Sequence, residues 1–102
     1  MLPQFGQSLG SLVRIVVVNG SGAPGLGTMI DGKLAPYGFS VVTSENASHF
    51  NVKHTTVVAT GQSNLSAAEV AARILGVKNV KVSDQPTSLA DVTIVAGKDL
   101  HT

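Results

Sequence analysis

The chain of 102 residues contains no cysteine and no tryptophan, and only four of its residues are aromatic, namely Phe5, Tyr37, Phe39 and Phe50. The fold therefore owes nothing to disulfides, and no cysteine nucleophile is available. Platforms on which nucleobases or sugar rings could stack are scarce. No stretch approaches the roughly 20 apolar residues of a membrane-spanning helix, so we expect this segment not to insert directly into a membrane.

Charge is also sparse, because charged residues make up 13% of the chain and the formal net charge is +1. The seven lysines and arginines are scattered along the sequence, whereas nucleic-acid binding normally uses a basic patch. We therefore expect no nucleic-acid partner. The hydrophobic content of 43% is that of an ordinary globular chain, and the length suits one domain with a real core.

Residues 1–11 lack the basic start and long apolar core of a signal peptide. We interpret them as a tag or linker, or as a short flexible N-terminal segment. The domain itself is expected to span residues 12–100.

Residues that could perform catalysis are not arranged for it. No Gly-x-Ser-x-Gly nucleophile elbow occurs, and the three histidines lack the spacing of metal ligands. His54, at the start of a predicted strand, is interpreted as structural. The acidic residues are spread over predicted caps, turns and helix faces, so nothing points to a pair of catalytic carboxylates. We predict no catalytic residue, no metal site and no cofactor; the chain is not expected to be an enzyme.

Hydrophobic periodicity predicts five strands and two helices. The first helix is expected to run from Pro24, at its first position, to about Ala35. The second is expected to start at a capping box, Ser66-Ala67-Ala68-Glu69, and to stop at Gly76. The strands are predicted over residues 12–18, 39–43, 54–60, 79–83 and 91–96.

The resulting order, β-α-β-β-α-β-β, predicts an α/β (α+β) fold. We expect a two-layer sandwich with a ferredoxin-like mixed sheet and both helices on one face. The polar loop 44–53 is too short for a crossover helix, so strands 39–43 and 54–60 are expected to form an antiparallel pair. Strand 79–83 is short enough to be an edge, and Gln85-Pro86 is predicted to form a turn.

The turn Asn19-Gly20-Ser21-Gly22 joins the first strand to the first helix and is the candidate binding turn. Gly20-x-Gly22-x-x-Gly25 also matches the dinucleotide fingerprint, with Glu45 where a ribose-binding acid would fall. A small nucleotide-binding domain is therefore the alternative function. The expected hairpin, the amide that Pro24 removes and the small size of the chain all weigh against it.

Glycines in the first predicted helix need an explanation, because each costs about 1 kcal/mol relative to alanine inside a helix. Gly25 and Gly32 lie two turns apart on one side, where a sheet, a partner or a ligand could approach closely. A helix that depends only on its packing is the favoured alternative.

Several motifs, in this order and spacing, resemble one known family. They are Val13-Arg14-Ile15-x-Val17-x-Asn19-Gly20-Ser21-Gly22, Pro24-Gly25-Leu26, His54-Thr55-Thr56-Val57-Val58, Leu75-Gly76 and Ala90-Asp91-Val92-Thr93-Ile94-Val95-x-Gly97-x-Asp99. The chain resembles the LytR C-terminal domain, an accessory domain of LytR–CpsA–Psr and related actinobacterial cell-envelope proteins. The resemblance covers about residues 12–100, and Gly27 and Gly32 depart from the alanine-like residues more usual there.

The resemblance implies a non-catalytic, extracytoplasmic binding or interaction module of a protein in cell-wall assembly. In that family the domain follows a membrane anchor outside these residues, with or without a phosphotransferase domain. The implied partner is a cell-wall polymer or an envelope protein, including the phosphotransferase domain of the parent protein. The resemblance transfers no catalytic residue to this chain.

Overall fold

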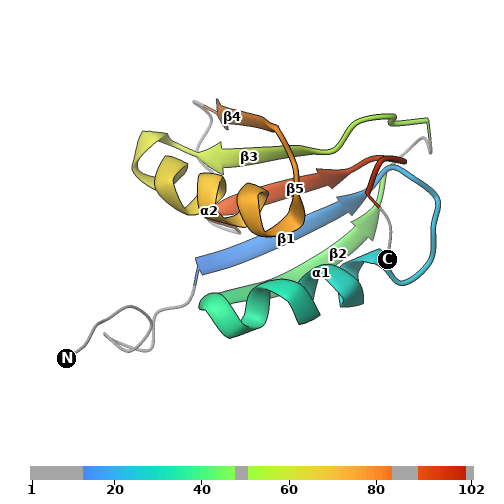
Figure 1. Cartoon of the computed structure of the whole chain (residues 1–102), viewed down its shortest axis with the longest axis horizontal. Helices are drawn as coiled ribbons and strands as arrows, with labels where there is room; N and C mark the ends of the chain where they lie inside the picture. The colour runs from blue at the N-terminus through green and yellow to red at the C-terminus, as the bar shows by residue number, and fades with distance from the viewer. Residues whose placement is uncertain (1–12, 48–50, 84–89, 101–102) are drawn as a thin grey trace.

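Five strands form one mixed sheet, and two helices cover one of its faces (Figure 1). The computed structural model describes residues 13–47, 51–83 and 90–100. The elements are β1 (Val13–Asn19), α1 (Leu26–Leu34), β2 (Phe39–Asn46), β3 (Thr56–Thr60), α2 (Leu65–Leu75), β4 (Asn79–Ser83) and β5 (Val92–Ala96), with 3-10 turns at Ala35–Tyr37 and Gln62–Asn64. The predicted two-layer α/β sandwich and its order of elements are confirmed. The predicted Gln85-Pro86 turn lies outside the described residues.

The strand order in the sheet is β2-β1-β5-β3-β4, which contains two β-α-β units. Helix α1 connects the parallel neighbours β1 and β2, and helix α2 connects the parallel neighbours β3 and β4. Strand β5 lies between the two units, parallel to β1 and antiparallel to β3. The carboxyl ends of β1, β2 and β5 therefore meet the amino ends of β3 and β4 at one end of the sheet.

The predicted hairpin between the second and third strands is wrong. These strands do run in opposite directions, but β1 and β5 lie between them. The segment that connects them crosses the end of the sheet, where Val52 N–H donates to Gly20 O at 3.1 Å and Lys98 N–H donates to Val52 O at 2.9 Å. A loop that crosses the sheet needs no hairpin geometry, so its length did not determine which strands are paired. Strand β4 does lie at an edge.

The core lies between the helices and the helix-facing side of the sheet. Helix α2 contributes only alanines to the fully covered layer, and their small side chains let the helix lie close to β3 and β4. Helix α1 contributes larger side chains. The largest fully buried aliphatic residues are Ile15, Val17, Leu26, Ile30, Leu34, Val57, Val92 and Ile94.

Glycines end the helical segments as predicted. Gly38 follows the 3-10 turn with φ 91°, and Gly76 caps α2 with φ 76°. The predicted start of α1 is wrong by two residues, because Gly25 is the N-cap, with φ 77°, and Leu26 is the first helical residue. Pro24 therefore lies before the helix.

The predicted capping box at the start of α2 is also wrong. Leu65 is already helical, so Ser66 lies inside the first turn, and Asn64 is the N-cap. The Asn64 side chain does not cap the helix; its Nδ2 donates to Thr60 O at 2.7 Å. The 3-10 turn at Gln62–Asn64 leads directly into the helix and takes the place of a side-chain cap.

Candidate functional site

The predicted binding turn is held by its own side chains. Asn19 Oδ1 accepts hydrogen bonds from Ser21 N–H at 3.0 Å, from Ser21 Oγ at 2.9 Å and from Gly22 N–H at 3.2 Å. Asn19 Nδ2 donates to Ala23 O at 2.7 Å, while Ser21 Oγ accepts from Ala23 N–H at 3.0 Å. Asn19 is 9% exposed. The polar side chains of the turn therefore act on the turn itself and make it rigid.

This arrangement occupies the amides of the turn that a pyrophosphate could otherwise bind. The amides of Ser21, Gly22 and Ala23 are already bonded within the turn, and Pro24 has no N–H. Gly20 is explained by packing, because a Cβ at this position would overlap the side chain of Val52 and lie 3.1 Å from Ala96 O. The parallel β1-α1-β2 unit does remove the topological objection to nucleotide binding. The occupied amides of the turn supply a different objection to nucleotide binding.

A groove lies directly beside the turn, between α1 and β2, and encloses about 490 Å³. One wall is the last part of β2, residues 41–46, and the other is the first turns of α1 with Asp31. Asn19, Pro24 and Gly25 close it at the turn. Hydroxyl, amide and carboxylate groups line most of the groove, and Val42, which is 45% exposed, adds an apolar contact. Sequence reasoning found Glu45 but missed the groove, although the polar end of β2, Thr43-Ser44-Glu45-Asn46, signals a strand that leaves the core.

Gly27 brings the two walls of the groove together. A Cβ on Gly27 would lie 2.8 Å from Ser44 Cβ and closer still to Ser44 Oγ, so only glycine allows α1 to approach β2 this closely. Gly32, in contrast, has nothing within 4 Å of the position of a Cβ. The less favoured alternative, a close approach on the Gly25 and Gly32 side, is therefore not what the structure shows. The glycine in close contact is Gly27, on the side that faces β2.

A second set of contacts ties the start of β3 to the chain that follows β5. Asp99 Oδ1 accepts from Thr55 N–H at 2.8 Å and from Thr55 Oγ1 at 2.7 Å, and Thr55 Oγ1 accepts from Gly97 N–H at 2.9 Å. A Cβ on Gly97 would lie 2.7 Å from the carbonyl carbon of His54. We call Thr55, Gly97 and Asp99 the clasp. Sequence analysis quoted Gly97-x-Asp99 only as part of a resemblance and did not find this role.

Asp99 and His54 face each other across the clasp. Burial raises the pKa of Asp99, but hydrogen bonds from the hydroxyl and amide of Thr55 and the charge of His54 outweigh it, so the pKa lies below its ordinary value of 3.8. His54 Nδ1 lies 3.7 Å from Asp99 Oδ2, and the His54 side chain is 76% exposed. The His54 side chain therefore lies at the surface beside Asp99.

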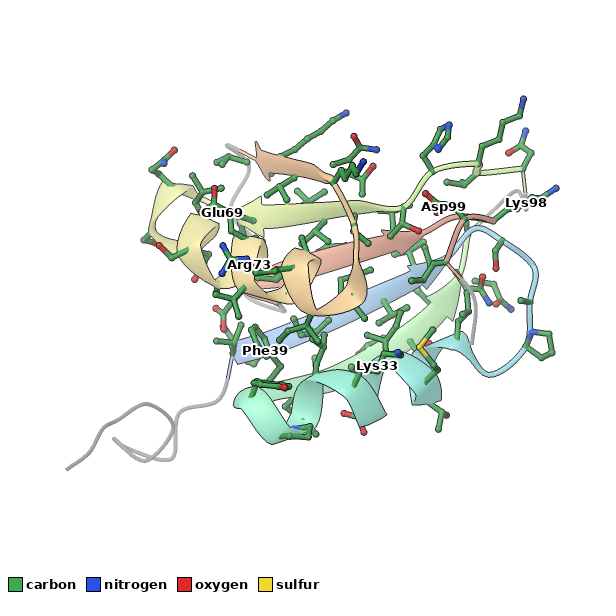
Figure 2. All side chains as sticks on the ribbon, viewed as in Figure 1. Lys33, Phe39, Glu69, Arg73, Lys98 and Asp99 are labelled. Atoms are coloured by element: carbon green, nitrogen blue, oxygen red, sulfur yellow. The ribbon has the colours of Figure 1, made fainter. Side chains whose placement is uncertain are left out.

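The clasp borders a second cleft of about 520 Å³, which also includes Lys78 and Asn79. Figure 2 shows Asp99 and Lys98 at the end of β5, far from Glu69 on α2. Lysines 53, 78 and 98 all belong to the segments around this cleft, since Asp99 N–H also donates to Lys53 O at 3.2 Å. The end of the sheet therefore has an acidic side at the α1–β2 groove and a more basic side at the start of β3 and β4.

At the opposite end of the sheet, Asp91 binds Arg14. Its carboxylate accepts from Arg14 N–H at 3.0 Å and lies 3.3 Å from Arg14 Nη2. Burial raises the pKa of Asp91, but the hydrogen bonds and charge of Arg14 lower it by more. The pKa of Asp91 therefore lies below its ordinary value of 3.8. Within the described residues, no group of three or more potential metal ligands is present.

Comparison with known protein families identifies the family of this chain. The model of the family described as LytR cell envelope-related transcriptional attenuator matches residues 12–100. The chain belongs to the LytR C-terminal domain family. The family resemblance inferred from the sequence is thus confirmed, and with it a cell-envelope-related accessory domain.

Two solved structures share the fold. The first is the solution structure of the C-terminal domain of RV0431, to which this chain is 30% identical, with a TM-score of 0.56. The match covers 83% of this chain and 71% of that one. The soluble domain of a conserved hypothetical secreted protein from Mycobacterium marinum, an Rv2700 ortholog, is 20% identical with a TM-score of 0.62, over 97% of this chain and 72% of that one. No match is found among curated proteins. In the part of the chain that the structure describes, no helix is long and apolar enough to cross a membrane.

Proposed function

We propose that this LytR C-terminal domain is a non-catalytic, extracytoplasmic binding module of a bacterial cell-envelope protein, and that it contacts its partner through the α1–β2 groove. The family is cell-envelope related, and one structural neighbour is a conserved hypothetical secreted protein. The partner is a cell-wall polymer or an envelope protein, including a phosphotransferase domain of the parent protein.

The groove itself is the observation that carries the proposal. It is open to solvent, lies beside a rigid turn and offers hydroxyl, amide and carboxylate groups from Thr28, Ser44, Asn46 and their neighbours. Such groups form hydrogen bonds with a polymer or a polypeptide. A surface that is already ordered loses little conformational entropy on binding, which favours affinity.

The chemistry of the clasp indicates a structural role for its hydroxyl rather than a catalytic one. Thr55 lies beside the His54–Asp99 pair, but its side chain is 1% exposed, and its hydroxyl donates to Asp99 and accepts from the Gly97 N–H. A nucleophile must reach a substrate and must pass its proton to a base. Thr55 is placed to hold two segments together.

The proposal is tested by filling the groove without disturbing the core. Thr28 is exposed on α1 and lines the groove, so Thr28→Trp places a large ring in the binding surface. Glu69→Trp is the matched control, because Glu69 is exposed on α2 at a distance from the groove. We expect the original chain to be retained on peptidoglycan or on an envelope protein fraction, with retention reduced at least tenfold by Thr28→Trp and unchanged by Glu69→Trp.

Two results would count against the proposal. If Thr28→Trp is retained as well as the original chain, the contact surface lies elsewhere. If the original chain binds neither peptidoglycan nor any envelope protein fraction, the domain is a structural spacer.

A further inference from the structure

Strand β2 is an open edge along the whole length of the α1–β2 groove. In the described sheet β2 has a strand neighbour only on its β1 side, and residues 41–46 all line the groove. An edge strand presents a row of main-chain donors and acceptors to which another strand can pair. The opposite edge, β4, contributes Asn79 to the cleft beside the clasp.

The backbone of β2 limits pairing to one short stretch. The register with β1 shifts between Ile15 and Val16, so Val42 is an extra residue without a partner on β1. Beyond this bulge, Thr43–Asn46 pair regularly with the end of β1. These residues span about 13 Å at 3.3 Å per residue, enough for a short extended segment. Exposed Val42 supplies an apolar contact at one end of it.

Helix α1 forms a second wall that faces any strand added to β2. Because Gly27 lacks a side chain, α1 lies directly against Ser44 of the edge strand. Successive side chains of a strand point to opposite faces, so alternate side chains of an added segment would enter the groove toward α1. Other peptide-binding domains recognise extended segments by strand addition of this kind.

The charge of the groove selects the partner. Asp31 and Glu45 line it, and none of the described lining residues is lysine, arginine or histidine. Complementary charge steers association and excludes partners of the same sign. The segment that fits is therefore basic.

We propose that the α1–β2 groove binds an extended, basic segment of a partner protein, which adds to β2 as a sixth strand of the sheet. This inference rests on the proposed function and makes it specific: the partner at this groove is a polypeptide recognised through its main chain. A polysaccharide would use the hydroxyl and carboxylate groups of the groove but could not extend the sheet.

The first experiment selects peptides from a phage-displayed library of random octapeptides on the immobilised chain, with depletion on the Thr28→Trp chain. We expect enriched peptides to alternate β-branched residues with lysine or arginine. Failure to enrich any peptide, or enrichment of peptides without basic residues, would overturn the inference. If Thr28→Trp still abolishes retention on peptidoglycan in that case, the proposed function stands and only the strand-addition inference fails.

The second experiment uses one enriched peptide and an analogue with N-methylated amides, which keeps side chains and charge but loses the main-chain donors. We expect the analogue to bind at least tenfold more weakly, and NMR amide shifts on binding of the parent peptide to map to residues 25–31 and 43–46. Glu45→Lys should weaken binding at least fivefold, whereas Glu69→Lys, the matched charge reversal on α2, should not. Equal binding of the N-methylated peptide, or shifts that map to β4, would contradict strand addition.

Discussion

The hydroxyl of Thr55 offers a sharp test of what ties the start of β3 to the chain that follows β5. Thr55 is 1% exposed, donates to Asp99 Oδ1 at 2.7 Å and accepts from the Gly97 N–H at 2.9 Å. Thr55→Val keeps the shape of the side chain and removes both hydrogen bonds. The Gly97 N–H is buried and loses its acceptor.

The expected magnitude follows from these two losses. An unsatisfied buried donor costs about 1–3 kcal/mol, whereas the bond to Asp99 is partly replaced by water because that carboxylate is 47% exposed. We therefore expect Thr55→Val to lower the free energy of unfolding by about 2–3 kcal/mol. Thr55→Ser keeps the hydroxyl and loses one methyl group, which costs about 1 kcal/mol.

Urea denaturation of the three chains at pH 7, with midpoints compared at equal m-values, measures the difference. If Thr55→Val is as stable as the original chain, the two hydrogen bonds of the Thr55 hydroxyl contribute nothing to stability. The clasp would then be only a consequence of packing around Gly97.

Four further outcomes are expected. Gly32→Ala should raise the free energy of unfolding by about 0.5–1 kcal/mol, because Gly32 is an exposed helical residue with open space around it, and a lower urea midpoint would show that α1 is constrained in another way. Asn19→Ala should lower the free energy of unfolding by about 1–3 kcal/mol, because the amides of Ser21 and Gly22 lose their acceptor. Near-native stability together with lost partner binding would instead show that Asn19 contacts the ligand. The pKa values of Asp91 and Asp99 lie below 3.8 in the folded chain. The stability that the two carboxylates contribute is therefore complete well above pH 3.8 and is lost as the pH falls through their folded pKa values. In urea melts at pH 7 and pH 3, the doubly substituted D91N/D99N chain should lose less stability on acidification than the original chain. NAD, NADP, FAD and ATP should not shift the melting temperature. A nucleotide that does bind, at a concentration of 100 times its dissociation constant, would stabilise the chain by about 2.7 kcal/mol. A thermal shift that Gly22→Val abolishes would support the nucleotide-binding alternative.

Local features of the sequence were sufficient to predict the elements of the fold. The β-branched runs gave the strands, and Asn79–Ser83 was predicted to the residue. Gly38 and Gly76 marked the ends of helical segments because the left-handed conformation there favours glycine. The helix starts were predicted less well, since the 3-10 turn before α2 and the left-handed Gly25 before α1 replace the caps that the motifs suggested.

The candidate site was predicted only in part. The Asn19–Gly22 turn was predicted to be the binding turn itself, and Glu45 was noted as a possible ribose-binding acid, but the groove that both of them line or border was not foreseen. Its second wall depends on Gly27 meeting Ser44, two residues from different elements. No motif encodes that contact, because it arises only when α1 packs on β2.

The sequence by itself determined the family, the order of elements and the edge position of β4, because these depend on residues close together in the chain. Only the tertiary structure decided that β2 pairs with β1 and not with β3, that Thr55 and Asp99 close the clasp, and that an acidic groove runs along an open edge. Strand pairing depends on which apolar faces can be buried together across the whole sheet. A loop such as residues 47–55 can connect strands that are neighbours or strands that are not, and its length alone does not distinguish the two.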